Sequence, residues 1–228
     1  MGPSSEPRTP SRLSDSLHHR LNMYALAASA AGVGVLSLSQ SAEAKVVYTP
    51  AHKWLPVNQY YYLDLNHDGV NDFRFYLGSY STVGIYRRNL IVEPQWENAV
   101  YGFSGGTCRA FCASALPKGI KVGPKSRFVQ RFPWMFQVSN SDGLYSWGRW
   151  RNVTKSAYLG LKFAIKGKFQ YGWARLGHIS HNKPVRALLM GYAYETVPNK
   201  PIITGKTKGP DVITVEPATL GTLAQGRK

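Results

Sequence analysis

Three of the chain's 12 acidic residues lie within nine positions of one another, in the stretch YYYLDLNHDGVNDFRFYLG at residues 60–78. Numbered from the first aspartate, side-chain oxygens occupy positions 1, 3, 5 and 9 of a loop, and a glycine occupies position 6. Carboxylate, amide and backbone carbonyl oxygens are the ligands that Ca²⁺ prefers. The spacing therefore predicts a calcium loop with the ligands Asp64, Asn66, Asp68, Asp72 and the backbone carbonyl of Val70.

Repulsion between the carboxylates explains why such a cluster favours a cation. Carboxylates about 4–5 Å apart repel one another by roughly 3–4 kcal/mol per pair at an effective dielectric constant near 20. A bound cation turns this repulsion into coordination. A single exposed loop should bind weakly, with a dissociation constant of about 10⁻⁴–10⁻³ M, and should act structurally. The alternative is an ordinary polar turn, because Asn, Asp and Gly are common turn residues.

The flanks of the loop differ from those of a helical calcium motif. An EF-hand requires a glutamate at position 12, where this chain has Phe75, and it requires flanking helices instead of strand-forming residues. The DxNxDGxxD pattern instead resembles the short calcium loops of FG-GAP repeats, which are set in β-hairpins. The pattern occurs once here, so the resemblance implies the calcium loop without the propeller.

The two cysteines, Cys108 and Cys112, lie four residues apart in GGTCRAFCAS. This spacing suits a local disulfide closed on one helical turn or in a compact loop. An exported protein would permit such a bridge, and two free thiols are the alternative.

Aromatic rings and cations alternate in the stretch RFPWMFQVSNSDGLYSWGRW and just beyond it, at residues 131–151. Such rings stack on sugar faces, and cations beside them pair with acidic groups. Strand alternation places Tyr145, Trp147 and Arg149 on one face and Trp150 on the other. The alternative is that the rings fill the core. The candidate glycan-binding residues are Trp134, Tyr145, Trp147, Trp150, Arg149 and Arg151.

Catalytic patterns are weaker. The sequence has no GxSxG motif, and the histidines after residue 44 show no metal-binding spacing with acids. Glu93 and Glu97 could act as a glycosidase pair if the fold brought them together. The alternative is that they are solvated or paired with a nearby Lys or Arg. We therefore predict no catalytic residue and keep a polysaccharide hydrolase as a third hypothesis.

Strand-forming segments must position these residues. Aromatic and β-branched residues recur between Gly, Pro, Asn and Asp, and no helical periodicity of useful length appears after residue 44. The clearest hairpin is Ala157–Leu176, which turns at Lys166-Gly167-Lys168. The less regular segment 104–123 is expected to hold a helical turn near 109–115. The other expected strands are 45–49, 59–63, 73–77, 82–91, 98–103, two within 131–150, and 184–195.

This pattern predicts a single antiparallel β-sandwich or jelly-roll-like domain at residues 45–204. Residues 1–44 combine a polar stretch, the apolar run MYALAASAAGVGVLSLS and the cleavage pattern Ala42-Glu43-Ala44. They predict a secretory signal peptide, with an uncleaved membrane anchor as the alternative. After cleavage no stable membrane span is expected. The polar segment 205–228 is expected to be a flexible tail.

The end of the chain resembles the secreted bacterial proteins that carry a PEP-CTERM sorting tail. The resemblance rests on YGWARL at 171–176, GYAYETVPNKPIITG at 191–205 and the final VEPATLGTLAQGRK. Val215 replaces the first proline of that motif, and the membrane helix of the class is missing, so the tail is degenerate and truncated. The resemblance implies an envelope or exopolysaccharide setting in a Gram-negative-type bacterium, and it implies no activity.

The charge balance bears on partners. The chain has 28 Lys and Arg against 12 Asp and Glu, a formal charge of +16, which favours acidic polysaccharide or an envelope surface. Export argues against nucleic acid, and a basic surface without a specific partner is the alternative. We expect a non-enzymatic protein of the periplasm, cell surface or extracellular matrix with a structural calcium loop. The alternative is a lectin-like module for acidic polysaccharide.

Overall fold

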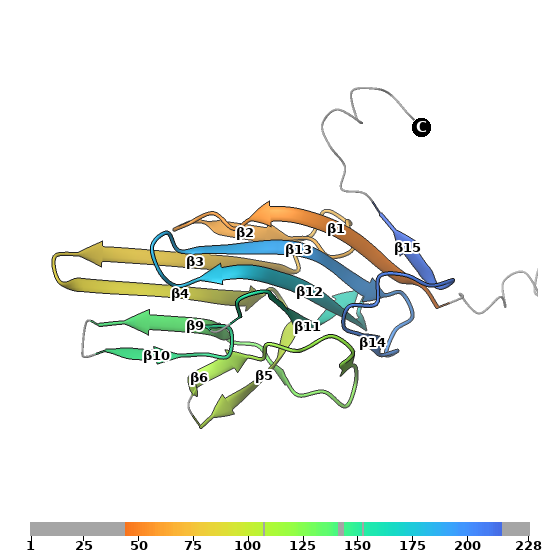
Figure 1. Ribbon diagram of the computed structural model, residues 1–228. Helices are drawn as coiled ribbons and strands as arrows, with labels where there is room; N and C mark the ends of the chain where they lie inside the picture. The colour runs from red at the N-terminus through yellow and green to blue at the C-terminus, as the bar shows by residue number, and fades with distance from the viewer. Residues whose placement is uncertain (1–43, 107, 141–143, 152, 216–228) are drawn as a thin grey trace, which may run out of the picture. The chain divides into compact units, whose positions relative to one another are not determined.

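The computed structural model describes residues 44–106, 108–140, 144–151 and 153–215 (Figure 1). All the regular elements in these ranges are β-strands, so the expected all-β class is confirmed. A search of the same ranges finds no helix that is long and apolar enough to cross a membrane. The predicted signal peptide, apart from Ala44, and the sorting-tail motif from Glu216 onward lie outside the described residues.

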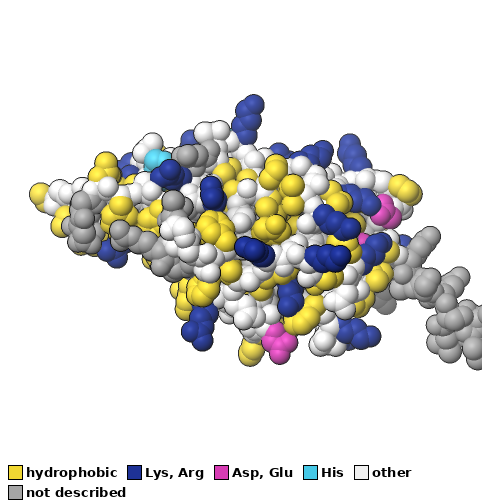
Figure 2. All heavy atoms as spheres, turned by 90° about the horizontal axis from the view of Figure 1, so that it is seen from below, with side chains coloured by type: hydrophobic (Ala, Val, Ile, Leu, Met, Phe, Trp, Pro, Cys, Tyr) yellow, Lys and Arg dark blue, Asp and Glu magenta, His cyan; other side chains and the backbone are white. Residues whose placement is uncertain are grey.

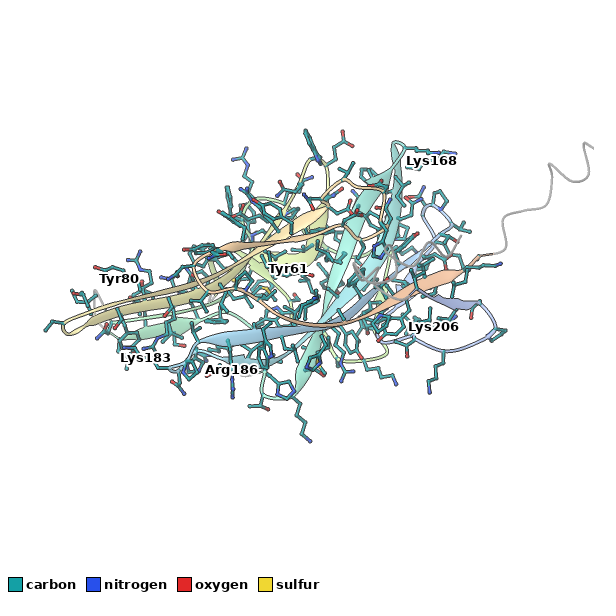
Figure 3. All side chains as sticks on the ribbon, turned by 90° about the horizontal axis from the view of Figure 1, so that it is seen from above. Tyr61, Tyr80, Lys168, Lys183, Arg186 and Lys206 are labelled. Atoms are coloured by element: carbon teal, nitrogen blue, oxygen red, sulfur yellow. A yellow bond between two sulfur atoms is a disulfide. The ribbon has the colours of Figure 1, made fainter. Side chains whose placement is uncertain are left out.

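The strands follow one another along the chain with short connections. They are β1 (Val46–Trp54), β2 (Tyr60–Leu63), β3 (Phe73–Thr82), β4 (Ile85–Pro94), β5 (Ala99–Gly105), β6 (Cys108–Ala113), β7 (Lys121–Val122), β8 (Phe128–Val129), β9 (Trp134–Ser139), β10 (Tyr145–Trp147), β11 (Ser156–Ile165), β12 (Lys168–Ser180), β13 (Arg186–Glu195), β14 (Ile202–Ile203) and β15 (Val212–Thr214). The long β3–β4 hairpin projects from the rest of the domain, with Tyr80 near its tip (Figure 3).

Thirteen strands form one large, curled and mostly antiparallel sheet. Neighbouring strands run in the order β15-β1-β13-β12-β11-β5-β6-β9-β4-β3-β2, with β10 added to β9 and β8 added to β5. The main core combines side chains from β2, β3, β4 and β9 with side chains from β11, β12 and β13. The two halves of the sheet therefore enclose one hydrophobic core, as in a sandwich (Figure 1).

Alternation along the central β11–β12 hairpin divides its side chains between two cores. Leu161 and Phe163 point into the main core, whereas Tyr171 and Trp173 belong to a second cluster on the opposite face of the sheet. The segments around β7 and β14 cover that second face and contribute Val122 and Ile202. Tyr101 of β5 and Phe128 of β8 pack against this cluster, so the same face of the sheet continues over these two strands.

The hairpin turn confirms the sequence prediction. Lys166 and Gly167 connect β11 to β12 with φ angles of +49° and +73°. Positive φ at both central residues is the type I′ geometry, whose twist matches that of the flanking strands.

Two sequence predictions differ from the structure. The helical turn expected near 109–115 is wrong, because β6 occupies Cys108–Ala113 and pairs with β5. The tail expected from Gly205 onward contains β15, which pairs in parallel with β1, and the Val215 N–H donates to the Tyr48 carbonyl at 2.8 Å. A strand of three residues is too short to show alternation in sequence, and the unpaired edge of β1 supplies its hydrogen-bond partners.

Candidate functional site

The acidic loop connects β2 to β3, and backbone hydrogen bonds shape it. The Asp64 carboxylate accepts bonds from the N–H groups of His67 and Gly69, each at 2.7 Å. The Asp68 carboxylate accepts a bond from the Val70 N–H at 2.9 Å. The His67 ring lies 3.1 Å from the Thr49 hydroxyl and so links the loop to β1. This is the geometry of a well-satisfied polar turn.

Asp72 differs from the other two aspartates because it is buried, with 6% of its surface exposed. Its carboxylate accepts a bond from the Leu65 N–H at 2.8 Å and lies 3.4 Å from the Asn98 amide nitrogen, which donates to it. Burial, with smaller contributions from Asp64 and Asp68, raises the pKa of Asp72 to about 6. Asp72 is therefore turned into the domain.

The donor atoms of the loop match a hard cation in kind, because all are oxygens. The amide of Asn66 donates to the Asp68 carboxylate at 2.8 Å, and its Oδ1 is buried without a hydrogen-bond donor among the described residues. Such an orphaned acceptor is what a cation would satisfy. Across the described ranges, however, no three His, Cys, Asp or Glu side chains form a group that could hold a metal. The predicted five-ligand set is thus not assembled around one point.

The structure joins Cys108 and Cys112 by a disulfide, with the two Cα atoms 6.0 Å apart. Residues four apart on a regular strand are separated by about 13 Å, so β6 must bulge to close the bridge. The register shows this bulge, since Ser104 pairs with Phe111 while the next residue, Gly105, pairs with Cys108. Both cysteines are buried, and Cys112 forms part of the wall of a surface hollow.

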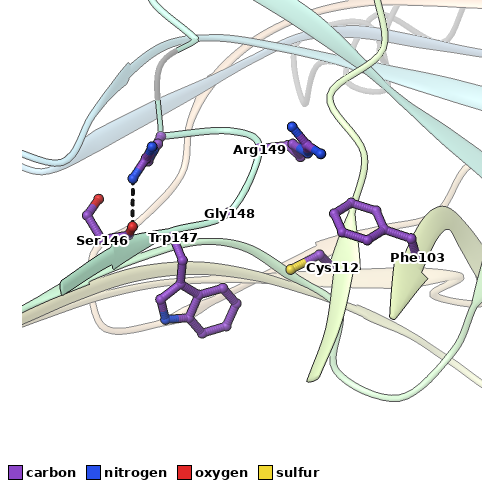
Figure 4. A pocket seen from close by; sticks show the side chains of 7 residues that line it. Phe103, Cys112, Ser146, Trp147, Gly148 and Arg149 are labelled. Atoms are coloured by element: carbon purple, nitrogen blue, oxygen red, sulfur yellow. Dashed lines mark hydrogen bonds between the residues drawn. The ribbon is translucent and has the colours of Figure 1, made fainter. Parts of the chain in front are cut away.

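That hollow has a volume of about 310 Å³ and combines aromatic and basic side chains (Figure 4). The guanidinium carbon of Arg149 lies 5.4 Å from the centre of the Phe103 ring. Arg151 donates a hydrogen bond to the Ser146 carbonyl at 2.6 Å, which orients its guanidinium. The lining residues are Phe103, Cys112, Ser146, Trp147, Gly148, Arg149 and Arg151.

Three of the six predicted glycan-binding residues, Trp147, Arg149 and Arg151, line this hollow. Trp134 lies behind Trp147, with ring centres 5.3 Å apart. The Tyr145 hydroxyl accepts a hydrogen bond from the Gln137 amide at 2.9 Å. Phe103 and Cys112, from β5 and β6, were not predicted, because nothing in the local pattern links them to residues 146–151.

The prediction that Trp150 binds a glycan is wrong, because its side chain is fully buried in the main core. Gly148 explains the difference: its φ is +100°, and a Cβ there would lie 2.3 Å from the Met135 carbonyl oxygen. The chain bends at this glycine, and strand alternation stops. The backbone N–H of Trp150 donates to the backbone carbonyl of Met135 at 3.1 Å, which fixes the main chain where it directs the indole into the core.

The two candidate glycosidase acids have different surroundings. Glu93 is buried, lies 2.5 Å from the guanidinium of Arg74 and accepts a hydrogen bond from the Tyr60 hydroxyl at 3.3 Å. Glu97 is exposed, and its backbone carbonyl accepts a bond from Gln130. Glu93 is therefore paired with an arginine, and Glu97 is exposed.

Charge is distributed unevenly along the chain, and the net charge of the whole chain does not show this. Residues 98–194 contain 15 Lys and Arg and only one acidic residue, Asp142. These residues supply β5 to β13. Figure 2 views the domain from the side on which β5 and β6 lie, and Lys and Arg are scattered there among hydrophobic side chains with few acidic ones. A count of charges in windows along the sequence would have found this signal.

No protein-family model, characterised protein or solved structure matches the chain.

Proposed function

We propose that this chain is an exported, non-enzymatic module that binds acidic polysaccharide at the hollow of Phe103, Trp147, Arg149 and Arg151. One observation carries the proposal: two aromatic rings and two guanidinium groups from separate parts of the chain converge on one concavity. Export rests on the signal-peptide pattern of residues 1–44.

The chemistry of the hollow favours an anionic sugar over a neutral one. Guanidinium groups bind carboxylate or sulfate through paired N–H donors, and aromatic rings cover the apolar faces of sugar rings. No carboxylate lines the hollow. The excess of positive charge should also steer a polyanion toward this side of the domain, and high salt should weaken the attraction.

Calorimetric titration with linear oligouronates tests the proposal, with a neutral glucan of equal length as the comparison ligand. The wild-type domain should bind the oligouronate and not the glucan. The double variant Arg149→Gln/Arg151→Gln and the single variant Trp147→Ala should each weaken binding about three- to tenfold, through lost charge-assisted hydrogen bonds and lost stacking respectively.

A matched control removes the same charge elsewhere. Lys53→Gln/Lys183→Gln alters two exposed lysines outside the hollow, and Lys183 lies in the β12–β13 connection (Figure 3). This variant should bind within about twofold of wild type. Equal losses in both double variants would show that net charge alone causes binding and would refute the proposed site.

We also propose that the acidic loop binds Ca²⁺ weakly and structurally, through Asp64, Asn66, Asp68 and the Val70 carbonyl. The buried, unpaired Oδ1 of Asn66 favours this proposal. Calcium titration followed by calorimetry and by the melting temperature tests it. A melting temperature that is the same with millimolar calcium and with chelator would refute it.

A further inference from the structure

Alternate residues of β5, on the face opposite the main core, each form part of a different hollow. Ala99, Tyr101 and Phe103 alternate along the strand, so their side chains share one face of the sheet. Phe103 lines the hollow described above, Tyr101 lines a second of about 390 Å³, and Ala99 lines a third of about 330 Å³. Because a strand rises about 3.3 Å per residue, Ala99 and Phe103 are about 13 Å apart, and the three hollows follow one another along β5.

Strand pairing adds side chains of neighbouring strands to the same face. Tyr101 pairs with Phe128 of β8, and Ala99 pairs with Lys162 of β11. The rings of Tyr101 and Phe128 lie in edge contact, with centres 6.2 Å apart, and the Phe128 ring stacks on Tyr171 at 5.8 Å. The Tyr101 and Phe128 rings thus join the second hollow to the third, and the buried Tyr171 ring supports Phe128.

Each hollow carries a pair of cations. Arg149 and Arg151 line the first. Lys121 and Lys125 line the second. Arg131 and Lys162 line the third, and the ammonium group of Lys162 lies 3.7 Å from the centre of the Phe169 ring.

These cations have no carboxylate partners in the described part of the chain. The ion pairs found there join Arg74 to Glu93, Lys200 to Glu195 and Lys206 to Asp211, and none of them involves the six cations of the hollows. None of the residues that line the hollows is acidic. The hollows therefore present six cations that no described carboxylate neutralises, and the Tyr101–Phe128 contact lies between the second and third hollows.

From this arrangement we infer that β5 forms the floor of a linear binding track on which one extended acidic polysaccharide occupies all three hollows. The inference rests on the proposed function and adds the form of the ligand: a linear chain with negative charges at regular intervals, long enough to pass from Phe103 to Ala99. The paired cations hold successive acidic groups, and the Tyr101–Phe128 surface supports the sugar rings between them.

Calorimetry with oligouronates of increasing length tests the track on the full exported domain. Affinity should rise with length until the ligand spans the three hollows and should then level off. With the long ligand, each of three double variants should weaken binding about three- to tenfold: Arg149→Gln/Arg151→Gln, Lys121→Gln/Lys125→Gln and Arg131→Gln/Lys162→Gln. Each variant removes two cations that would form partly exposed ion pairs with acidic groups of the ligand. The control Lys53→Gln/Lys183→Gln should change affinity less than about twofold.

The outcomes separate the two proposals. If the short and long ligands depend only on Arg149 and Arg151, the first hollow binds polysaccharide and the track is refuted. If no oligouronate binds, both proposals are refuted. Preferential binding of single-stranded DNA or of vesicles rich in anionic lipid, with the same three double variants affected, would overturn the assignment to polysaccharide. Melting curves of each variant should match wild type, because the substituted side chains line open surface hollows.

Discussion

Asp72 offers the sharpest test of the electrostatics of the acidic loop. Its pKa is about 6 in the folded protein, against 3.8 in its ordinary state, mainly because the carboxyl is buried. The folded state therefore holds this proton more tightly than the unfolded state does. The resulting stabilisation is fully present below about pH 4 and is lost as the pH rises to about 6. A shift of about two pKa units corresponds to about 3 kcal/mol.

The variant Asp72→Asn should remove this pH dependence. An asparagine has nearly the same shape and can still accept the Leu65 N–H, but it carries no charge that burial could penalise. The free energy of unfolding of the variant minus that of wild type should therefore rise by up to about 3 kcal/mol between pH 3.5 and pH 7. The constant part of the difference reports the altered hydrogen bonds, whereas its slope reports the ionisation.

Urea denaturation at closely spaced pH values, in the presence of chelator, measures this difference. The chelator is needed because a bound cation would favour the ionised loop and mask the effect. A difference that stays flat from pH 3.5 to pH 7 would refute the conclusion that burial destabilises the ionised carboxyl. A difference that falls with pH would mean that Asp72 is stabilised as an anion by its neighbours.

Other predictions concern the calcium loop, the core and the disulfide. At pH 7, 10 mM calcium should raise the free energy of unfolding by about 1.4–2.7 kcal/mol for a dissociation constant of about 10⁻³–10⁻⁴ M, and Asp64→Asn should abolish the gain in the same denaturation assay. Trp150→Ala should cost about 3–5 kcal/mol of stability, whereas Trp147→Ala, at a half-buried site, should cost clearly less in parallel urea melts. Replacing Cys108 and Cys112 by serine should lower the free energy of unfolding by about 2 kcal/mol, because the disulfide closes a short loop and so reduces the conformational entropy of the unfolded chain. Thermal melts would measure this loss.

Local chemistry was enough to predict much of the fold. The strands of the Ala157–Leu176 hairpin follow from side-chain alternation, and Gly167 marks the turn because it adopts positive φ without strain. The acidic loop was predicted as a hairpin connection for the same reason, since its turn residues separate two aromatic strands. In each case the determining interactions lie within a few residues of one another.

Trp147 and Trp150 show where local reasoning stops. They are three residues apart, and each lies within two residues of Arg149, yet Trp147 lines a hollow and Trp150 fills the core. The bend at Gly148 decides between them, and that bend depends on the close approach of the β9 backbone. Whether a residue is buried depends on which distant segments of the chain pack against it. A short sequence window does not contain that information.

By itself, the sequence determined the all-β class, the position of the main hairpin, the acidic loop and the excess of positive charge over residues 98–194. Each of these depends on residue types and on spacing along one segment. Only the tertiary structure decided which cations and rings share a surface. The three hollows along β5 draw on residues from 99 to 201, and these meet because β5 pairs with β6, β8 and β11 and because the segment around β14 folds back onto β7. Long-range strand pairing, which no local pattern encodes, is the physical reason.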